Sequence, residues 1–357
     1  MGEHFERRFP VPYYDSDARK AYKGAWTYLK AGWQNVTIEE PGIILDVNSL
    51  YPYVMATKKL PFGEGRFFTG KYKPDKIYDL YIQMLSCSFE LKPGYLPTIQ
   101  LKKNLSFIPT QYLDSSNGEE VTLCLTSVDI EIFLSHYDVS NIQYYSGWKF
   151  KSSDKMFVDY VNYWMDIKIK AEKEKNKAMR TIAKLYLNNL YGKLAKSPLI
   201  ANKMPYLDDK GIVRFKMMPY ENVNPIYVPA AAFITAYARE KTITAAQAVY
   251  DRFIYADTDS LHLLGTDIPE GIKVDPYELG AWKHENTFEK ARFIRAKSYI
   301  EVIDGENYIT CAGLPKSGIE QITFDEFRLG YEYPASLKSK AVPGGIILKE
   351  TTFKIRA

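Results

Sequence analysis

Cysteine and histidine are scarce in this chain of 357 residues, which holds three cysteines and four histidines. Neither residue type is grouped as a metal site requires, so we expect all seven side chains to be structural or on the surface. No apolar run reaches the roughly 18 residues that a membrane span needs. Met1–Pro10 is charged and therefore unlike a signal peptide. These absences predict a protein of the reducing cytoplasm that has no membrane partner.

A strong net charge is also absent, because the balance over the whole chain is only +4. The charge is distributed unevenly. Residues 166–196 contain nine basic and three acidic side chains, with tyrosines among them. A solvated helical hairpin would show more balanced signs, whereas a basic stripe beside aromatic rings suits phosphates and single-stranded nucleic acid.

Two apolar stretches end on carboxylates. The string GIILDVNSLYP at residues 42–52 leads to Asp46, and FIYADTDSLHLL at residues 253–264 leads to Asp257 and Asp259. A carboxylate at the end of a buried strand is costly unless it is paired or binds a metal. Two such ends side by side would form a two-metal site for phosphoryl transfer, with oxygen ligands that suit magnesium. Taken singly, the first string could also be a strand that enters a proline turn, and the second a hairpin turn.

A third string, KLYLNNLYG, lies between these two at residues 184–192. On a helix, Lys184, Asn188 and Tyr191 share one face, while neighbouring leucines such as Leu185 can pack on the other sides. The polar face offers a charge for a triphosphate, an amide and a flat ring for a base. An ordinary amphipathic helix with a solvated polar face is the alternative.

Together the three strings resemble motifs A, B and C of the family B DNA polymerases. DVNSLYP is similar to motif A, KLYLNNLYG to motif B and YADTDS to motif C, and their order along the chain also agrees. The chain most resembles the protein-primed branch, typified by the phi29-type phage polymerases. LPTIQLKKNLSF, FITAYAR and VPGGIIL are similar to further segments of that branch, so the resemblance runs from about Tyr22 to about Lys354.

The resemblance implies an α+β fold, the right-hand polymerase of palm, fingers and thumb with two terminal-protein-region insertions. In chain order it implies a lead-in and first palm segment with motif A (1–57), a first terminal-protein region (58–155), the fingers with motif B (156–195), a second terminal-protein region (196–228), a second palm segment with motif C (229–304) and the thumb (305–357). The residues themselves predict short strands over 58–155, two helices over 156–195, a β-hairpin over 196–228 and a long Ala-rich helix over 229–252. Residues 1–21 are expected to be extended.

Catalytic and nucleotide-binding residues follow from the same resemblance. Asp46 and Asp259 match the metal-ligand aspartates, Val47 matches the residue whose carbonyl joins them, and Asp257 matches the companion carboxylate. For the incoming dNTP, Tyr51 matches the tyrosine beneath the sugar. The remaining dNTP positions are Lys184 and Lys168 for the triphosphate, and Asn188 and Tyr191 beside the nascent base pair. The chain is about four residues longer than its relatives between Lys168 and motif B, which weakens the match of Lys168.

DNA contacts are implied at four places. Ser49 lies where the branch contacts DNA. Lys297 and Tyr299 resemble a Lys-x-Tyr motif near the primer end. The template-binding positions are Thr235 and Arg239 in ITAYAR, and Tyr22 and Gly24 in YKGA, a string that could also be a plain turn.

The resemblance therefore implies a DNA-templated DNA polymerase core that works as a monomer on template-primer DNA and dNTPs. It implies two Mg²⁺ ions, which Mn²⁺ could replace, together with priming by a terminal protein and strand displacement. For a phage protein the place of action is the bacterial host cytoplasm. Relatives carry an exonuclease domain ahead of the residue that matches Tyr22, where only about twenty residues stand here. We therefore expect a core without 3′–5′ exonuclease, which a separate chain could supply.

Two other functions stay open. One is a catalytically inactive palm that serves as a binding scaffold for DNA or a priming protein, against which the three carboxylates argue. The other is an RNA-templated polymerase. Tyr51 argues against ribonucleotide use, because its ring would clash with a 2′-hydroxyl. Asp-Thr-Asp also differs from the Tyr-x-Asp-Asp string of reverse transcriptases.

Overall fold

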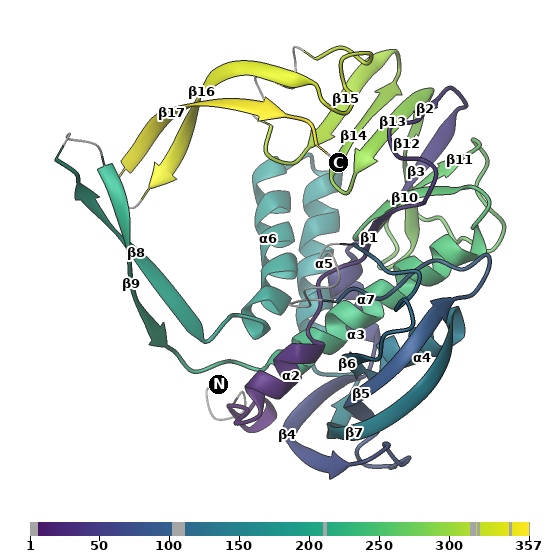
Figure 1. Ribbon diagram of the computed structural model, residues 1–357, viewed down its shortest axis with the longest axis vertical. Coiled ribbons are helices and arrows are strands. Elements are labelled where there is room, and N and C mark those ends of the chain that lie inside the picture. The colour runs from purple at the N-terminus through teal and green to yellow at the C-terminus, as the bar shows by residue number, and fades with distance from the viewer. Residues whose placement is uncertain are drawn as a thin grey trace. The chain divides into compact units, whose positions relative to one another are not determined.

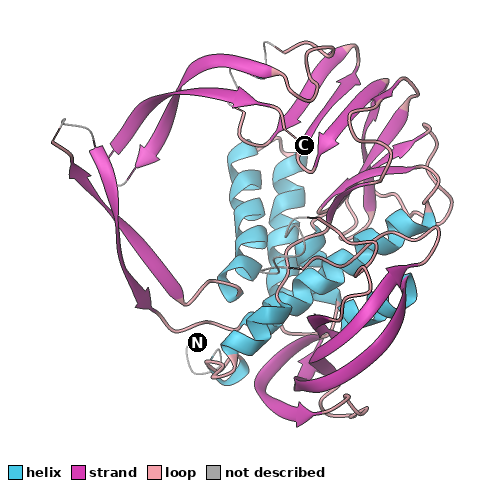
Figure 2. Ribbon diagram, viewed as in Figure 1, coloured by secondary structure: helices cyan, strands magenta, loops and turns pink. Residues whose placement is uncertain are grey.

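The computed structural model describes residues 6–101, 111–209, 213–314, 319, 322–342 and 345–356, with backbone alone over 333–352. The strings LPTIQLKKNLSF and VPGGIIL lie partly outside the described residues. The chain forms two compact units. The first comprises Met1–Tyr28, Ile43–Lys196 and Pro225–Asn286, and the second comprises Leu29–Gly42, Ser197–Asn224 and Thr287–Ala357. Helices and antiparallel sheets occur together, which confirms the expected mixture of α and β structure (Figure 2).

A five-stranded sheet is the centre of the first unit. Its strand order is β1-β10-β11-β3-β12, with β1 at Thr27–Leu29, β10 at Phe253–Asp257, β11 at Ser260–Leu264, β3 at Gly42–Val47 and β12 at Trp282–Phe288. The side chains of β3 and β10 are buried until each strand reaches its aspartate. This explains why both strands read as continuous apolar runs rather than as alternating patterns.

Helix α7 (Val228–Ala248) packs against this sheet and is buried along most of its length. Pro229 lies in its first turn, where a missing backbone N–H costs nothing. Its many alanines allow neighbouring elements to approach closely. The helix ends at Ala248, four residues before the predicted end.

Helices α5 (Val158–Lys173) and α6 (Lys177–Leu194) lie side by side (Figure 1). The side chain of Asn176 caps α6 by accepting a hydrogen bond of 3.1 Å from the Met179 backbone N–H. Leu187 and Leu194 are buried, but Leu185 is 54% exposed. The expectation that Leu185 packs is therefore wrong, because the helix contacts its neighbours along a narrower stripe than the leucine spacing suggests.

The expectation that residues 1–21 are extended is also wrong. Asp15–Ala21 form helix α2, which buries Ala18 and Ala21. Two hydrogen bonds of 2.9 and 3.0 Å join the Arg19 guanidinium to the Asp15 carboxylate one turn earlier. Helix α3 (Leu50–Thr57) follows β3 directly, and Ser49 stands at its N-cap in a left-handed conformation.

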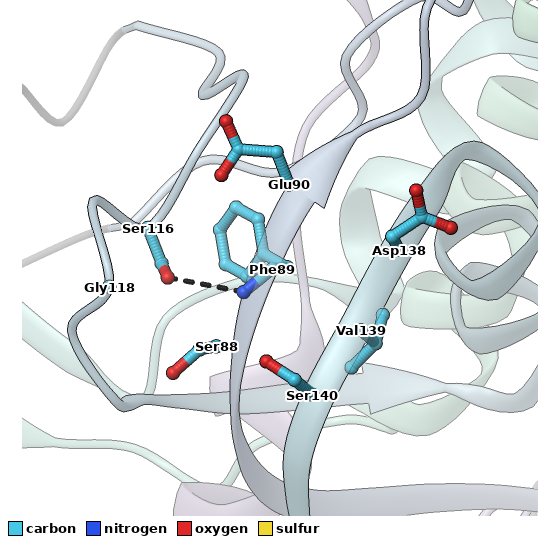
Figure 3. A pocket seen from close by; sticks show the side chains of 8 residues that line it. All are labelled: Ser88, Phe89, Glu90, Ser116, Gly118, Asp138, Val139 and Ser140. Carbon is cyan, nitrogen blue, oxygen red and sulfur yellow. Dashed lines mark hydrogen bonds between the residues drawn. The ribbon is translucent and has the colours of Figure 1, made fainter.

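A second sheet of the first unit has the order β4-β7-β5-β6, with β4 at Leu60–Thr69, β7 at Tyr137–Ser153, β5 at Leu80–Leu91 and β6 at Val121–Thr126. Helix α4 (Ser127–His136) contacts this sheet and begins at Thr126, whose hydroxyl accepts from the Asp129 backbone N–H. A hollow of about 260 Å³ opens here (Figure 3), lined by Ser88, Phe89, Glu90, Ser116, Gly118, Asp138, Val139 and Ser140. It holds none of the described catalytic candidates.

The second unit is built of strands. One sheet has the order β15-β14-β13-β2, with β15 at Glu306–Cys311, β14 at Ser298–Ile303, β13 at Lys290–Arg295 and β2 at Thr37–Ile38. Strands β16 (Glu332–Val342) and β17 (Gly345–Lys354) pair with each other. Strands β8 (Leu199–Leu207) and β9 (Val213–Asn222) form an antiparallel ladder where the turn signals predict a hairpin.

The three cysteines are free thiols. Cys87 and Cys311 are buried, and Cys124 is half-buried. Burial raises the pKa of the Cys87 thiol to about 11 and that of Cys124 to about 12. Among the described residues, no helix combines the length and the apolar character that crossing a membrane requires.

Candidate active site

The β10–β11 turn joins the end of strand β3 through the backbone. The Val47 N–H donates a hydrogen bond of 2.8 Å to the Asp259 carbonyl oxygen. Asp257 pairs with Ser260 across the turn, which leaves Thr258 and Asp259 as its two loop residues. The apolar strands thus deliver carboxylates from residues 46 and 257–259 to one end of the sheet.

Asp46 is surrounded by more negative charge than nearby cations balance. Burial raises the pKa of its carboxyl group to about 7, and the charges of Asp259 and Glu285 add to the rise. Lys283 and Lys184 act in the opposite direction but do not cancel it. A divalent cation between Asp46 and Asp259 would relieve both the repulsion and the lost hydration. The described residues do not gather three or more His, Cys, Asp or Glu side chains at one metal-sized site, so the chemical match rests on the two carboxylates.

Asp257 is held by hydroxyl groups. The hydroxyls of Thr27 and Thr258 both lie close to the same oxygen, Oδ1, at 3.3 and 3.2 Å. Thr27 comes from β1 and Thr258 from the turn itself. These two contacts hold the Asp257 carboxylate in one orientation.

Cations of α5 and α6 lie within electrostatic reach of Asp46. Lys168 Nζ donates a hydrogen bond of 2.9 Å to Ser49 Oγ. Burial lowers the pKa of Lys168, and Arg180 and Lys184 lower it further by repulsion. The structure thus brings Lys168, Lys184 and Arg180 into one cluster in spite of the length difference noted for Lys168.

Two aromatic rings join motif A to motif B. Tyr51 of α3 stacks on Tyr191 of α6, with ring centroids 4.1 Å apart and planes inclined by 24°. Burial, then the neighbouring Tyr191, raises the pKa of Tyr51 far above the ordinary tyrosine value. Burial and Tyr191 also raise the pKa of Tyr22, which places Tyr22 near the same rings. Asn188 lies one helical turn before Tyr191 and is exposed.

The motifs did not indicate Arg180, Lys283 or Glu285. Lys283 and Glu285 alternate along β12, whose preceding loop is tied to motif A. Asn48 N–H donates to the Ala281 carbonyl and Gly280 N–H donates to the Asn48 carbonyl, both at 2.9 Å. In the sequence, Lys283 and Glu285 could have been noticed as two charged residues at alternate positions just after a glycine. Arg180 could have been noticed because it belongs to the basic stretch of residues 166–196.

Thr235 and Arg239, the predicted template-binding pair, are buried in this structure, and their contact with DNA stays a prediction. They are only 1% and 4% exposed. The Arg239 guanidinium makes three hydrogen bonds of 2.8–3.1 Å to the Asp129 carboxylate. It also donates to the carbonyl oxygens of Lys23 and Gly24. Arg239 thus supports the loop that contains Gly24, which is itself exposed, and sequence alone did not reveal the buried carboxylate partner.

The remaining candidates, Lys297 and Tyr299, lie in the second unit. Lys297 is exposed and has a left-handed backbone (φ 58°) in the turn between β13 and β14. Tyr299 stacks on Phe293 with ring centroids 5.4 Å apart. Within this unit Lys297 lies in the turn and Tyr299 at the start of the strand that follows it.

Comparison with known proteins identifies what this arrangement is similar to. Residues 8–276 match the family described as DNA polymerase type B, organellar and viral. The DNA polymerase of Bacillus phage phi29 is 43% identical over 362 residues, which cover 96% of this chain and 62% of that protein. The DNA polymerase of Streptococcus phage Cp-1 is 39% identical over 352 residues, covering 96% of this chain and 61% of that one.

Solved structures agree with these sequence matches. The phi29 DNA polymerase complexed with primer-template DNA and incoming nucleotide substrates superimposes with a TM-score of 0.94 at 42% identity. The binary complex of the same polymerase with primer-template DNA superimposes with a TM-score of 0.92. Each match covers the whole of this chain and 65% of the other. This chain therefore spans less than two thirds of the length of these relatives.

Proposed function

Since the chain belongs to the organellar and viral type B DNA polymerases, we propose that it adds dNTPs to a primer 3′-hydroxyl under the direction of a DNA template. The observation that carries this proposal is the convergence of Asp46 and Asp259: burial, and then the neighbouring charge of Asp259, raises the pKa of Asp46 to about 7. A site that brings carboxylates together despite their burial and repulsion is suited to divalent metal ions and to the phosphoryl transfer that these ions assist.

Polymerases of this family depend on divalent metal ions, and we propose Mg²⁺ as the physiological one. Asp46, Asp259 and the carbonyl of Val47 would hold the ions, with Asp257 as the supporting carboxylate. Bound Mg²⁺ would activate the primer hydroxyl and stabilise the charge of the pyrophosphate that leaves. The carboxylates contribute position and charge, and no covalent intermediate is needed.

The cation cluster of Lys168, Arg180 and Lys184 is proposed to receive the triphosphate. A lysine ammonium is a compact charge with three donors and suits phosphate oxygens. Lys168 would exchange its bond to Ser49 for one to phosphate. Tyr51 would lie beneath the deoxyribose, and Tyr191 and Asn188 beside the new base pair. The existing contact of Tyr51 with Tyr191 keeps these positions rigid before a nucleotide arrives.

The phi29 relative has been solved with primer-template DNA, and we propose the same ligand here. Exposed Lys297, the adjacent Tyr299 and the loop of Tyr22 and Gly24 would contact it. The segments 1–57 and 229–304 would then be the palm, 156–195 the fingers and 305–357 the thumb. Residues 58–155 and 196–228 are proposed as terminal-protein regions, for protein priming and strand displacement in the cytoplasm of a bacterial host.

Primer extension with metal-ligand variants tests the polymerase proposal. Asp46→Ala and Asp259→Ala should each lower the extension rate by roughly a hundredfold or more, the scale seen when one electrostatic group of an active site is removed. Binding of template-primer DNA, measured by fluorescence anisotropy, should change little because phosphate contacts dominate affinity. Asp251→Ala, an exposed carboxylate of the same unit, is the matched control.

Near-normal extension by both variants would contradict the assignment of Asp46 and Asp259 as metal ligands. Binding of DNA without any metal-dependent extension by the intact chain would favour the inactive scaffold. Extension on an RNA template as fast as on a DNA template would favour the RNA-templated polymerase.

A further inference from the structure

The turn that carries Asp259 has an unusual backbone. Thr258 has a φ of 66°, a left-handed conformation that β-branched residues rarely adopt. The Asp259 N–H lies 2.7 Å from the Asp257 carbonyl oxygen, which closes a three-residue turn around Thr258. Tight turns of this kind are strained, and they persist only where surrounding groups hold them in place.

Groups outside the turn bind both the backbone N–H and the backbone carbonyl of Thr258. The Thr258 N–H donates 3.0 Å to the Trp26 carbonyl beside β1. On the other side, the Thr258 carbonyl accepts a hydrogen bond of 2.8 Å from the Thr242 hydroxyl of α7. Trp26 and Thr242 are both fully buried. Thr258 is therefore held from one side by Trp26, directly before β1, and from the other by helix α7.

The Thr242 hydroxyl has two acceptors within reach. The second is the Ala238 carbonyl one turn earlier, at 3.2 Å. A hydroxyl has a single proton, and the shorter contact to Thr258 is the better hydrogen bond. Thr242 thus uses its donor outside its own helix, which is not what a threonine inside a helix usually does.

From this geometry we propose that Thr242 is a positioning residue for the carboxylates of the metal site. It acts through Thr258: the bond to the carbonyl fixes the turn, and the turn fixes the directions of Asp257 and Asp259. Without that donor, the Thr258 peptide can relax and Asp259 moves away from Asp46. The inference rests on the proposed function for its role in catalysis, whereas its effect on metal binding does not require that the chain be a polymerase.

Thr242→Val tests this directly, because valine keeps the shape of threonine and removes the hydroxyl. Mn²⁺ binding to the intact chain, followed by electron paramagnetic resonance, should weaken on the order of tenfold, the scale known for groups that orient metal ligands. In primer extension, the Mg²⁺ concentration for half-maximal rate should rise by a similar factor, while KM for the template-primer stays unchanged. Thr242→Ser should restore both quantities.

Three comparisons make the result unambiguous. Thr244→Val makes the same change at an exposed position of α7 and should leave metal binding and extension unchanged. If valine is not accommodated, Thr242→Ser and Thr242→Ala form a second pair that differs only by the hydroxyl. The melting temperature of each variant shows whether a loss exceeds that expected from unfolding.

The proposal is overturned if Thr242→Val binds Mn²⁺ like the unaltered chain, or if Thr242→Ser is as impaired as Thr242→Val. A chain that binds Mn²⁺ in a Thr242-dependent manner but extends no primer would instead contradict the polymerase assignment alone.

Discussion

At the scale of single residues, burial decides what a charged side chain can do. Asp46 is raised in pKa to about 7 by burial and by its acidic neighbours, so its charged form is unfavourable without a cation. Arg239 is more deeply buried than Asp46, at 4% exposed, but it has Asp129 as a partner and all its N–H groups are hydrogen-bonded. The unbalanced charge of Asp46 is what the proposed metal ion would neutralise, whereas Arg239 connects α4 with α7.

Neutralising Asp46 should therefore stabilise the protein when metal is absent. Asp46→Asn removes the repulsion from Asp259 and Glu285, and we expect a gain of about 1–3 kcal/mol in the free energy of unfolding at pH 8. Thermal denaturation in EDTA measures it, with Asp251→Asn as the surface control. A melting temperature equal to or below that of the unaltered chain would show that Asp46 is already compensated.

At the scale of elements, helix α4 depends on a histidine that must remain neutral. His136 ends the helix and is only 6% exposed, with Nδ1 2.7 Å from the Leu96 carbonyl oxygen. Burial, and to a smaller degree Lys92, lowers the pKa of His136. The unfolded chain binds a proton near pH 6.5, whereas the folded chain does so only at lower pH. Stability is therefore present above pH 6.5 and is lost as pH falls below it.

With Asp46→Asn in every protein compared, so that the stabilising protonation of Asp46 at low pH does not mask the effect, we expect the melting temperature to decline between pH 7.5 and pH 5.5, and His136→Gln to decline less over the same range. Glutamine keeps a donor for Leu96 but cannot titrate. The effect should be on the order of 1 kcal/mol, because one pKa unit corresponds to about 1.4 kcal/mol. His284→Gln changes an exposed histidine and should decline like the unaltered chain. Parallel curves for all three proteins would contradict the role of His136.

The sequence was informative about elements where one strong pattern applied. Continuous apolar runs predicted β3 and β10, and the charge of Asp259, in the turn after β10, acts on Asp46 near the end of β3. Residues 1–21 were predicted to be extended, but the oppositely charged Asp15 and Arg19, four residues apart, form an ion pair that stabilises helix α2. Arg239 and Glu285 depend on partners more than 100 residues away in the chain, Asp129 and Asp46. Spacing within one segment could not reveal such contacts.

At the scale of the whole molecule, the two strands of the β8–β9 hairpin bury little of their surface. Nearly all described side chains of both strands are exposed or half-exposed. The Val223 N–H donates 2.8 Å to the Pro198 carbonyl, so the two ends of the hairpin meet. A part with so little buried surface contributes little to folding and is available for a ligand.

We consider a deletion of residues 199–222, with a short glycine linker between Pro198 and Val223. The melting temperature should stay within about 2 °C of the unaltered value. A loss below about 1 kcal/mol in the free energy of unfolding shifts the melting temperature little in a chain of this size. Extension on a single-stranded template should persist, whereas extension through a downstream duplex should fall strongly. Equal rates through the duplex with and without the hairpin would exclude its proposed role in strand displacement. As a control, residues 208–212 alone are replaced with glycines, which changes the loop but keeps both strands of the hairpin.

The shielded cysteines have a practical consequence for following this molecule. Maleimide dyes react with thiolates, and thiols whose pKa is raised to about 11 or 12 supply almost none at neutral pH. A cysteine introduced at exposed Thr244 would then be the preferred site for a fluorophore. Burial also raises the pKa of the Cys311 thiol. The native chain thus provides its own weakly reactive background, and single molecules could be labelled without first removing Cys87, Cys124 and Cys311.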